Sequence, residues 1–342
     1  MSADLAVWSV VTPTSVARLV ERARALERRG VAGLFASQAY GPPWVPLAAA
    51  AGATERMLLA SGIALAFVRS PVETALAAAD MDRLTEGRFV LGLGAGVRSW
   101  HESIFGADYE RPVARFRETI AVVRHVLSGL AAGDLQPFEG AFHRLSFAGY
   151  EPGPPPVRPD LPIWVAALRP AMIRVAGELG DGLLGHPAWS ATWIREQVWK
   201  ELRAAASGAG RDPDEVTVNL WTRVAIADDP VEAVGDAKPS VALYARLPQY
   251  AEYYEAHGFG EVARNLHELD RSGVSLPEQA AHVPDEMATE FVQVGEPTAV
   301  VEQVQRFAEG AASVCLLPPV GIPPERVRAY QRRINEAFLE PA

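Results

Sequence analysis

Three glycines occupy alternate positions in one short stretch, Leu91–Gly96, which ends an apolar run beginning at Phe89. Glycine at the end of a strand lets the backbone come close to a flat ligand or a phosphate. The stretch is not the dinucleotide-binding fingerprint, because Val97 stands where the third glycine belongs. It can equally be a tight turn that leads out of a buried strand. From these residues both interpretations remain open.

A second candidate is Pro162–Pro170, an apolar run that leads directly into a predicted helix. Proline suits the first helical position, and the amides at a helix start have no intrahelical acceptor. Together with Arg169, they form a predicted site for an anion such as phosphate. The alternative is an ordinary helix start with a solvent-exposed Arg169, since every helix has such an end.

The histidines do not have the spacing of a metal site. His101 and Glu102 are not part of the zinc motif H-E-x-x-H, because Phe105 occupies the second histidine position. The other histidines are scattered, so we predict no metal. No G-x-S-x-G elbow and no Walker A sequence occurs, which argues against hydrolases and NTPases. His186 follows a short apolar run and is either a pocket residue or a loop histidine bonded to the backbone.

These residues must be positioned by an alternation of short apolar runs and helix-period segments, which predicts βα units and a parallel sheet. Eight strands in this order predict an α/β protein built as a single (β/α)8 (TIM) barrel domain, residues 1–342, with its site at the C-terminal strand ends. The predicted strands are Leu5–Val11, Ala32–Ser37, Met57–Leu65, Phe89–Leu93, Ile163–Ala166, Gly182–Leu184, Val216–Ala227 and Val314–Leu317.

Two segments depart from the plain alternation, and one helix start has a recognisable cap. Gly133–Gly149 predicts a hairpin, with turn residues at its centre. Residues 246–290 are helical and rich in aromatic side chains, and we interpret them as an insertion before the last βα unit. Ser70 and Glu73 have the spacing of a capping box at the start of the third helix.

Composition limits the partners and the compartment. The 342 residues carry a net charge of −10, which disfavours nucleic acid and anionic membranes as partners. No apolar run is long enough to span a membrane, and the first residues do not resemble a signal peptide, so we expect a cytoplasmic protein. Cys315 is the only cysteine, so no intrachain disulfide forms, and its apolar neighbours predict a buried side chain.

Longer blocks carry a family resemblance. Leu58–Gly96 resembles the segment of luciferase-like oxidoreductases that contains strands three and four, and Pro162–Leu184 resembles the fifth βα unit of that family. Leu243–Tyr250 and Val292–Pro297 fit its C-terminal third. The likeness covers nearly the whole chain, and the nearest branch is the actinobacterial type that uses coenzyme F420, a deazaflavin.

The resemblance implies three cofactor-binding segments. The ring would lie across a bulge at the end of strand three, which in related enzymes holds a non-proline cis peptide. A loop after strand four would line the pocket, and the start of the helix after strand five would hold the phosphate. The implied residues are Gly62, Ile63 and Ala64, then Ala95, Gly96, Val97 and Arg98, and then Ala166, Ala167, Leu168 and Arg169.

The chain departs from the family at two acidic positions. Relatives often carry an acidic residue just after strand two, where this chain has Gln38, and some have glutamate after the strand-four glycines, where it has Val97. A neutral amide cannot act as a general base at ordinary pH. We therefore assign no catalytic residue. Gln38, Trp44 and His186 remain candidate pocket residues.

The resulting hypothesis is an F420-dependent oxidoreductase that transfers a hydride between the coenzyme and an unidentified small organic substrate. One alternative is an FMN-dependent monooxygenase of the same family. The other is a non-catalytic cofactor-binding protein, which the missing acidic residues keep open. We also expect a homodimer, because the helical faces around Trp44–Ala53 and Ser70–Leu84 are rich in alanine.

Overall fold

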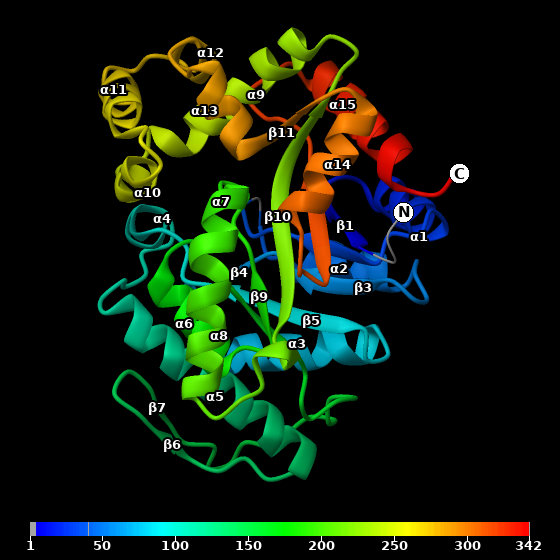
Figure 1. Ribbon diagram of the computed structural model, residues 1–342. Helices are drawn as coiled ribbons and strands as arrows, with labels where there is room; N and C mark the ends of the chain where they lie inside the picture. Colours follow the sequence, from blue (N-terminus) through cyan, green and yellow to red (C-terminus); the bar gives the residue numbers. More distant parts are fainter. Residues whose placement is uncertain (1–4, 40, 342) are drawn as a thin grey trace. The chain divides into compact units, whose positions relative to one another are not determined.

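The structure is a computed structural model that describes residues 5–39 and 41–341. The chain forms two compact units, which are described separately. The N-terminal unit contains residues 8–184 and 201–218, and the C-terminal unit contains the described residues before Trp8, residues 185–200 and those from Asn219 onward. Figure 1 labels helices and strands of both units.

Parallel strands form the sheet of the N-terminal unit, in the order β1-β2-β3-β5-β8-β9, with β4 beside β5. The strand predicted at Met57–Leu65 is interrupted at Gly62–Ile63, so it appears as two strands, β3 and β4. The strands are β1 (Ala6–Val11), β2 (Gly33–Ala36), β3 (Leu58–Ser61), β4 (Ala64–Leu65), β5 (Phe89–Gly94), β8 (Ile163–Ala166) and β9 (Gly182–Leu184).

Two tryptophans fill one face of this sheet, because glycines on the neighbouring strands leave room for them. Trp8 is in register with Gly33, and Trp164 with Gly182. A Cβ added at either glycine would lie 2.4 Å from the facing tryptophan ring. The Trp8 ring lies 5.3 Å from that of Trp164 and 4.5 Å from that of Phe35, so the core of this face is aromatic.

The helices of the N-terminal unit follow its strands, as the alternation predicts, and Figure 1 shows them around the sheet. They are α1 (Val16–Arg28), α2 (Trp44–Ala51), α3 (Pro71–Leu84), α4 (Arg98–Ser103), α5 (Pro112–Ala132), α6 (Pro170–Leu179) and most of α8 (Trp199–Gly208). The predicted hairpin is present as β6 (Phe138–Glu139) and β7 (Arg144–Leu145), which pair antiparallel.

The predicted capping box at α3 is wrong. The Ser70 hydroxyl does cap the helix, but it accepts from the Val72 amide in the first turn. The Glu73 carboxylate lies 3.4 Å from the Arg69 guanidinium. This nearby cation draws Glu73 into an ion pair, so its side chain does not close the box.

The C-terminal unit has three parallel strands in the order β11-β10-β12. They are β10 (Thr217–Ile226), β11 (Val292–Gly295) and β12 (Ser313–Leu317). The sequence did not predict β11. The helices are α7 (Ala191–Trp193), the π-helix Ile194–Val198, α9 (Pro230–Ala245), α10 (Ala251–Ala256), α11 (Gly260–Arg271), α12 (Leu276–Ala280), α13 (Asp285–Phe291), α14 (Pro297–Phe307) and α15 (Pro324–Phe338).

Residues 246–290 are helical, as predicted, but their status as an insertion stays a prediction, as does the single domain over residues 1–342. With β3 and β4 taken together, the structure contains all eight predicted strands, and their parallel order is that of a (β/α)8 barrel. Within the described part of the chain, no helix combines the length and the apolar character that crossing a membrane requires.

Candidate active site

Gln38 fastens the end of β2 to the predicted cofactor bulge. The peptide bond Gly62–Ile63 is cis. The backbone amide of Gln38 donates to the Ile63 carbonyl oxygen at 3.2 Å. The backbone amide of Leu65 donates to the side-chain oxygen Oε1 of Gln38 at 2.8 Å. Gln38 is 5% exposed. Its side chain therefore acts as a brace for the bulge through a neutral acceptor.

Arg69 links Gln38 to Trp44, two of the predicted pocket residues. Its Nη1 donates to Gln38 Oε1 at 2.9 Å, and its guanidinium carbon lies 5.7 Å from the centre of the Trp44 ring. Burial lowers the pKa of Arg69, while the charge of Glu73 opposes that shift. Trp44 Nε1 is a buried donor with no partner among the described residues. The sequence reasoning did not identify Arg69.

The glycines of β5 let this strand pack tightly against the bulge. A Cβ at Gly92 would lie 1.9 Å from the Ser61 carbonyl oxygen. A Cβ at Gly94 would lie 2.0 Å from Ile63 Cδ1 and 3.3 Å from Ala166 Cβ. The ends of β4, β5 and β8 therefore meet at Gly94. Close packing between strands explains these two glycines, and the side chains that face Gly94 where the strand ends meet are the apolar Ile63 and Ala166.

The buried His101 and the half-buried Tyr109 fix the loop that follows β5. His101 Nε2 lies 2.6 Å from the Ala95 carbonyl oxygen, and the Tyr109 hydroxyl donates to the Gly96 carbonyl at 2.9 Å. Burial lowers the pKa of His101, which favours a neutral ring that donates from Nε2. Arg98 is exposed, forms an ion pair with Glu102 at 2.6 Å and lies over the Tyr109 ring. The loop is thus held by its own neighbours.

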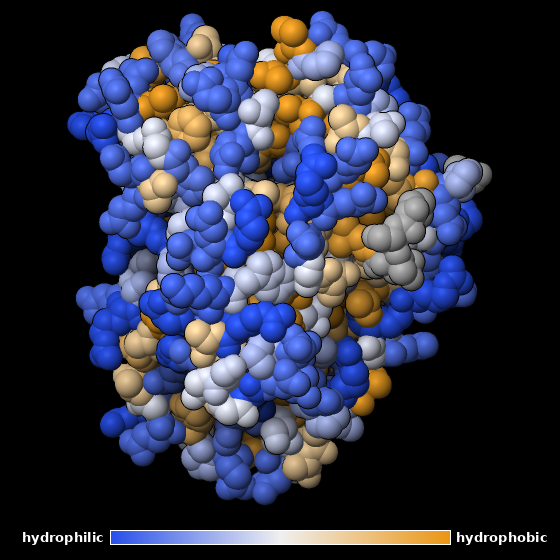
Figure 2. All heavy atoms as spheres, viewed as in Figure 1, coloured by the Kyte–Doolittle hydropathy of each residue, from blue (hydrophilic) through white to orange (hydrophobic). Residues whose placement is uncertain are grey.

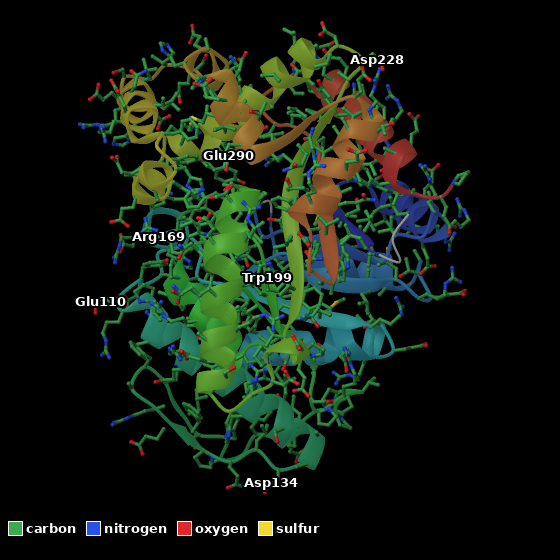
Figure 3. All side chains as sticks on the ribbon, viewed as in Figure 1. Glu110, Asp134, Arg169, Trp199, Asp228 and Glu290 are labelled. Atoms are coloured by element: carbon green, nitrogen blue, oxygen red, sulfur yellow. The ribbon has the colours of Figure 1, made fainter. Side chains whose placement is uncertain are left out.

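The third predicted segment follows β8. The Ala167 amide donates to the Leu184 carbonyl at 3.1 Å, which ties this segment to the end of β9. Arg169, labelled in Figure 3, is the extended residue before α6, and its carbonyl accepts from the Met172 amide at 3.0 Å. Its side chain does not cap the helix. The helix begins at Pro170, as predicted.

Accessibility divides the predicted cofactor residues into two groups. Gly62, Ala64, Ala95 and Ala167 are buried, so they can offer only backbone atoms or packing. A Cβ at Gly62 would lie 2.7 Å from the Phe35 ring. The half-buried or exposed members are Ile63, Gly96, Val97, Arg98, Ala166, Leu168 and Arg169, and all of these except glycine have a side chain that can reach a ligand.

His186 lies in the C-terminal unit and is held in a neutral form. The Ala188 amide donates to His186 Nδ1 at 3.1 Å, so the ring proton is on Nε2, which donates to the Tyr250 hydroxyl at 3.1 Å. Burial, and then the charge of Arg223, lowers the pKa of His186 to about 3. His186 thus combines the two sequence interpretations, because it bonds to the backbone and also belongs to an aromatic cluster with Tyr244 and Tyr250.

Arg223 is a buried residue that the sequence reasoning missed. It is 8% exposed and lies on β10, where its Nη1 donates to the Pro318 carbonyl at 2.8 Å. Its Nε is buried without a partner. The signal in the sequence was a single cation inside the apolar run Val216–Ala227. In the described parts of both units, no three His, Cys, Asp or Glu side chains are grouped to hold a metal.

The sequence matches the model of the family described as "Luciferase-like monooxygenase" over residues 2–313. It is 32% identical to an uncharacterized protein of Mycobacterium tuberculosis, over 96% of this chain and 95% of the other. The chain belongs to this family and is an oxidoreductase. Another M. tuberculosis protein, whose name proposes a coenzyme F420-dependent oxidoreductase, is 29% identical over 95% of this chain and 96% of its own length.

Solved structures confirm the fold class. The coenzyme F420-dependent tetrahydromethanopterin reductase of Methanopyrus kandleri has a TM-score of 0.81, at 21% identity, over 98% of both chains. The oxygenating component of 3,6-diketocamphane monooxygenase from Pseudomonas putida, solved with FMN, has a TM-score of 0.67, at 17% identity, also over 98% of both chains. The predicted (β/α)8 barrel is therefore confirmed, while these distant likenesses leave the cofactor open.

Proposed function

We propose that this protein is an F420-dependent oxidoreductase that transfers a hydride between the coenzyme and a small organic substrate. The observation that carries the proposal is the meeting of β4, β5 and β8 at Gly94, where Ile63 and Ala166 are the facing side chains. Small and apolar groups at this point suit the face of a flat ring. The relative with an F420-dependent name supports the choice of coenzyme.

The residues of the N-terminal unit fit such a group. Ile63 and Ala166 would contact the ring, while Gln38 keeps the bulge in place through its bonds to Ile63 and Leu65. The buried Trp44 Nε1 is a donor that still lacks an acceptor. When bound, the deazaflavin supplies the hydride chemistry, and the protein's part is to position the reactants and exclude water.

The start of α6 would hold the phosphate of the coenzyme. Pro170 has no N–H and the Met172 amide already donates to the Arg169 carbonyl, so the Ala171 amide is the first-turn donor of this ten-residue helix that is left for an anion, and Arg169 adds a cation to a chain of net charge −10. Arg169→Ala should weaken deazaflavin binding by about tenfold to a hundredfold, since a charged hydrogen bond contributes roughly 1.5–3 kcal/mol. Arg174→Ala is the matched control, because Arg174 lies on the same helix and pairs with Glu201.

A side-by-side titration with F420 and FMN tests the proposal. We expect saturable binding of F420, monitored by its absorbance and fluorescence, with affinity clearly above that for FMN. Unchanged F420 affinity in Arg169→Ala would remove that residue from the site. Binding without turnover of any substrate would favour a non-catalytic cofactor-binding protein.

An FMN-dependent monooxygenase is the second candidate, supported by the likeness to an FMN-containing monooxygenase structure. The two candidates differ in their use of oxygen. A monooxygenase would bind reduced FMN and consume oxygen in the presence of substrate, whereas the proposed enzyme would do neither. Oxygen-electrode traces with each reduced cofactor separate them.

A further inference from the structure

Arg223 carries a charge that nothing in its described surroundings neutralises. Its one hydrogen bond, from Nη1, goes to a carbonyl oxygen of Pro318, and its buried Nε has no partner. No ion pair within the described residues includes it. Removing a cation from water is costly unless an anion or several hydrogen-bond acceptors replace the lost solvent. This arginine is therefore incompletely satisfied by the protein.

The position of Arg223 is defined by three strands. It is the last residue of β10 in register with β12, opposite Leu317, and the first in register with β11, opposite Val292. Leu317 and Pro318 are only half-buried, and Arg223 itself keeps 8% exposure. The unsatisfied edge of the guanidinium thus lies beside residues that are in contact with solvent.

The titratable groups near Arg223 are neutral. His186 follows Gly185, whose amide donates to the Asn219 carbonyl of β10 at 2.8 Å, and Cys315 is in register with β10 on the neighbouring strand β12. Burial lowers the pKa of His186, with a further contribution from the charge of Arg223, and burial raises the pKa of the Cys315 thiol. The His186 ring packs with two tyrosines, at 4.9 Å from Tyr244 and 5.5 Å from Tyr250. The cluster therefore combines one cation with flat, largely apolar rings and contains no carboxylate.

We propose that Arg223 and the ring cluster of His186, Tyr244 and Tyr250 bind a small organic carboxylate with a flat apolar body. The Nε and Nη2 edge of a guanidinium matches the two oxygens of a carboxylate, and such paired bonds are short and strong. The aromatic side chains would contact the body of the ligand. The inference goes beyond the proposed function, because it assigns a binding site without reference to a cofactor.

The competing explanation is that Arg223 only braces the Pro318 carbonyl at the end of β12. Arg223→Gln separates the two ideas, since glutamine can still donate to a carbonyl but carries no charge. Arg223→Lys keeps the charge without the planar fork. Arg246→Gln is the matched control: Arg246 belongs to the same unit, also has a buried Nε without a partner, but pairs with Asp270 at 2.8 Å.

Benzoate is the probe and benzamide its neutral isostere, titrated calorimetrically into the purified chain without cofactor. We expect benzoate to bind wild type at least tenfold more tightly than benzamide. Arg223→Gln should lose about tenfold to a hundredfold in benzoate affinity, Arg223→Lys less, and Arg246→Gln nothing. Circular dichroism melts show which variants fold. If Arg223→Gln does not fold, two measurements test the proposal instead. They are the affinity of wild type for benzoate compared with benzamide, and the benzoate affinity of Arg223→Lys.

Equal affinity for benzoate and benzamide, or unchanged benzoate binding in Arg223→Gln, would reduce Arg223 to a structural brace. Tighter binding of inorganic phosphate than of benzoate, lost in the same variant, would replace the carboxylate by a phosphate. Competition between F420 and benzoate, with equal losses in the variant, would assign the arginine to the cofactor. Because benzoate binding needs no cofactor, its outcome is separate from that of the proposed function.

Discussion

Because the Gln38 side chain is neutral, Arg69 needs a counter-charge from another residue. An acid at this position would pair with the guanidinium directly, whereas Gln38 Oε1 offers only a neutral acceptor, shared between Arg69 and the Leu65 amide. Arg69 therefore takes its counter-charge from Glu73. One substitution in the sequence thus changes both the acid–base chemistry available at the bulge and the local pairing of charges.

Gln38→Leu should destabilise the fold. It removes the acceptor of two hydrogen bonds and leaves buried donors unsatisfied, at a cost of about 2–4 kcal/mol in the free energy of unfolding. Gln38→Glu keeps both bonds and should recover most of that loss. Urea unfolding curves of the three proteins measure the effect. Equal stability of Gln38→Leu and wild type would show that water replaces the lost acceptor.

His186 makes stability depend on pH in a defined direction. Its folded pKa is about 3, below the value of roughly 6.5 expected in the unfolded chain. The unfolded chain therefore binds the proton first as pH falls. The stabilisation is fully present above about pH 6.5 and is lost as pH falls toward 3, because folding then requires this histidine to stay neutral.

Between pH 7.5 and pH 5, we expect this histidine to cost about 1–2 kcal/mol of stability, allowing for partial exposure of the ring. His186→Asn can keep the bond from the Ala188 amide but does not titrate, so its unfolding free energy should fall less over this range. Parallel slopes for His186→Asn and wild type would contradict the assignment. His101 adds a smaller dependence of the same sign.

At the scale of elements, the ends of helices and strands that are marked by proline or glycine could be predicted from the sequence. Ends without such a residue could not. Ile163–Ala166 matches the prediction residue for residue and α6 begins at Pro170 as predicted, because Pro162 and Pro170 mark these boundaries. β11 was missed, since four residues that follow a helix without a turn residue give no periodic signal. The break between β3 and β4 depends on bonds from Gln38, and such long-range contacts leave no mark in a local pattern.

If Gly92 is required for close strand packing, alanine should have opposite effects on stability at Gly92 and at Gly235. Gly92→Ala would place a Cβ against backbone of β3 and should destabilise by about 1–3 kcal/mol, as overpacking does. A Cβ at Gly235, inside α9, meets no atom within 4 Å. Gly235→Ala should therefore stabilise by roughly 0.5–1 kcal/mol through helix propensity. Thermal melts of both variants give the signs, and a neutral Gly92→Ala would refute tight packing at this point.

At the scale of the whole molecule, the chain carries a net charge of −10, and the face shown in Figure 2 is largely hydrophilic with hydrophobic groups between the polar ones. Such a surface suits a protein that meets small molecules more than polyanions. The sequence located the three segments of the candidate cofactor site through family resemblance, and all three lie in the N-terminal unit. It could not find Arg69, whose importance comes from contacts with Gln38 and Trp44, or Arg223, whose importance comes from burial and an unpartnered Nε, because only a folded chain defines these properties.

The homodimer stays a prediction, and two exposed side chains make it specific. Val45 on α2 is 69% exposed and Leu84 on α3 is 57% exposed, and these helices pack against each other. We expect wild type to be a dimer by light scattering at micromolar concentration, and Val45→Glu to shift it to monomer by burying a charge at the contact. Val231→Glu, at a 79% exposed valine of α9, is the control. A wild-type protein that is monomeric at this concentration would contradict the predicted homodimer.

Cys315 gives the protein a practical property. It is the only thiol of the chain, lies fully buried on β12, and its pKa is raised by burial, so the reactive thiolate is scarce in the native state. Maleimide reagents should therefore leave the native protein unlabelled. A cysteine introduced at any exposed position can then carry a single fluorophore without first replacing Cys315. The slow rate at which Cys315 itself is labelled measures how often the core of the C-terminal unit opens.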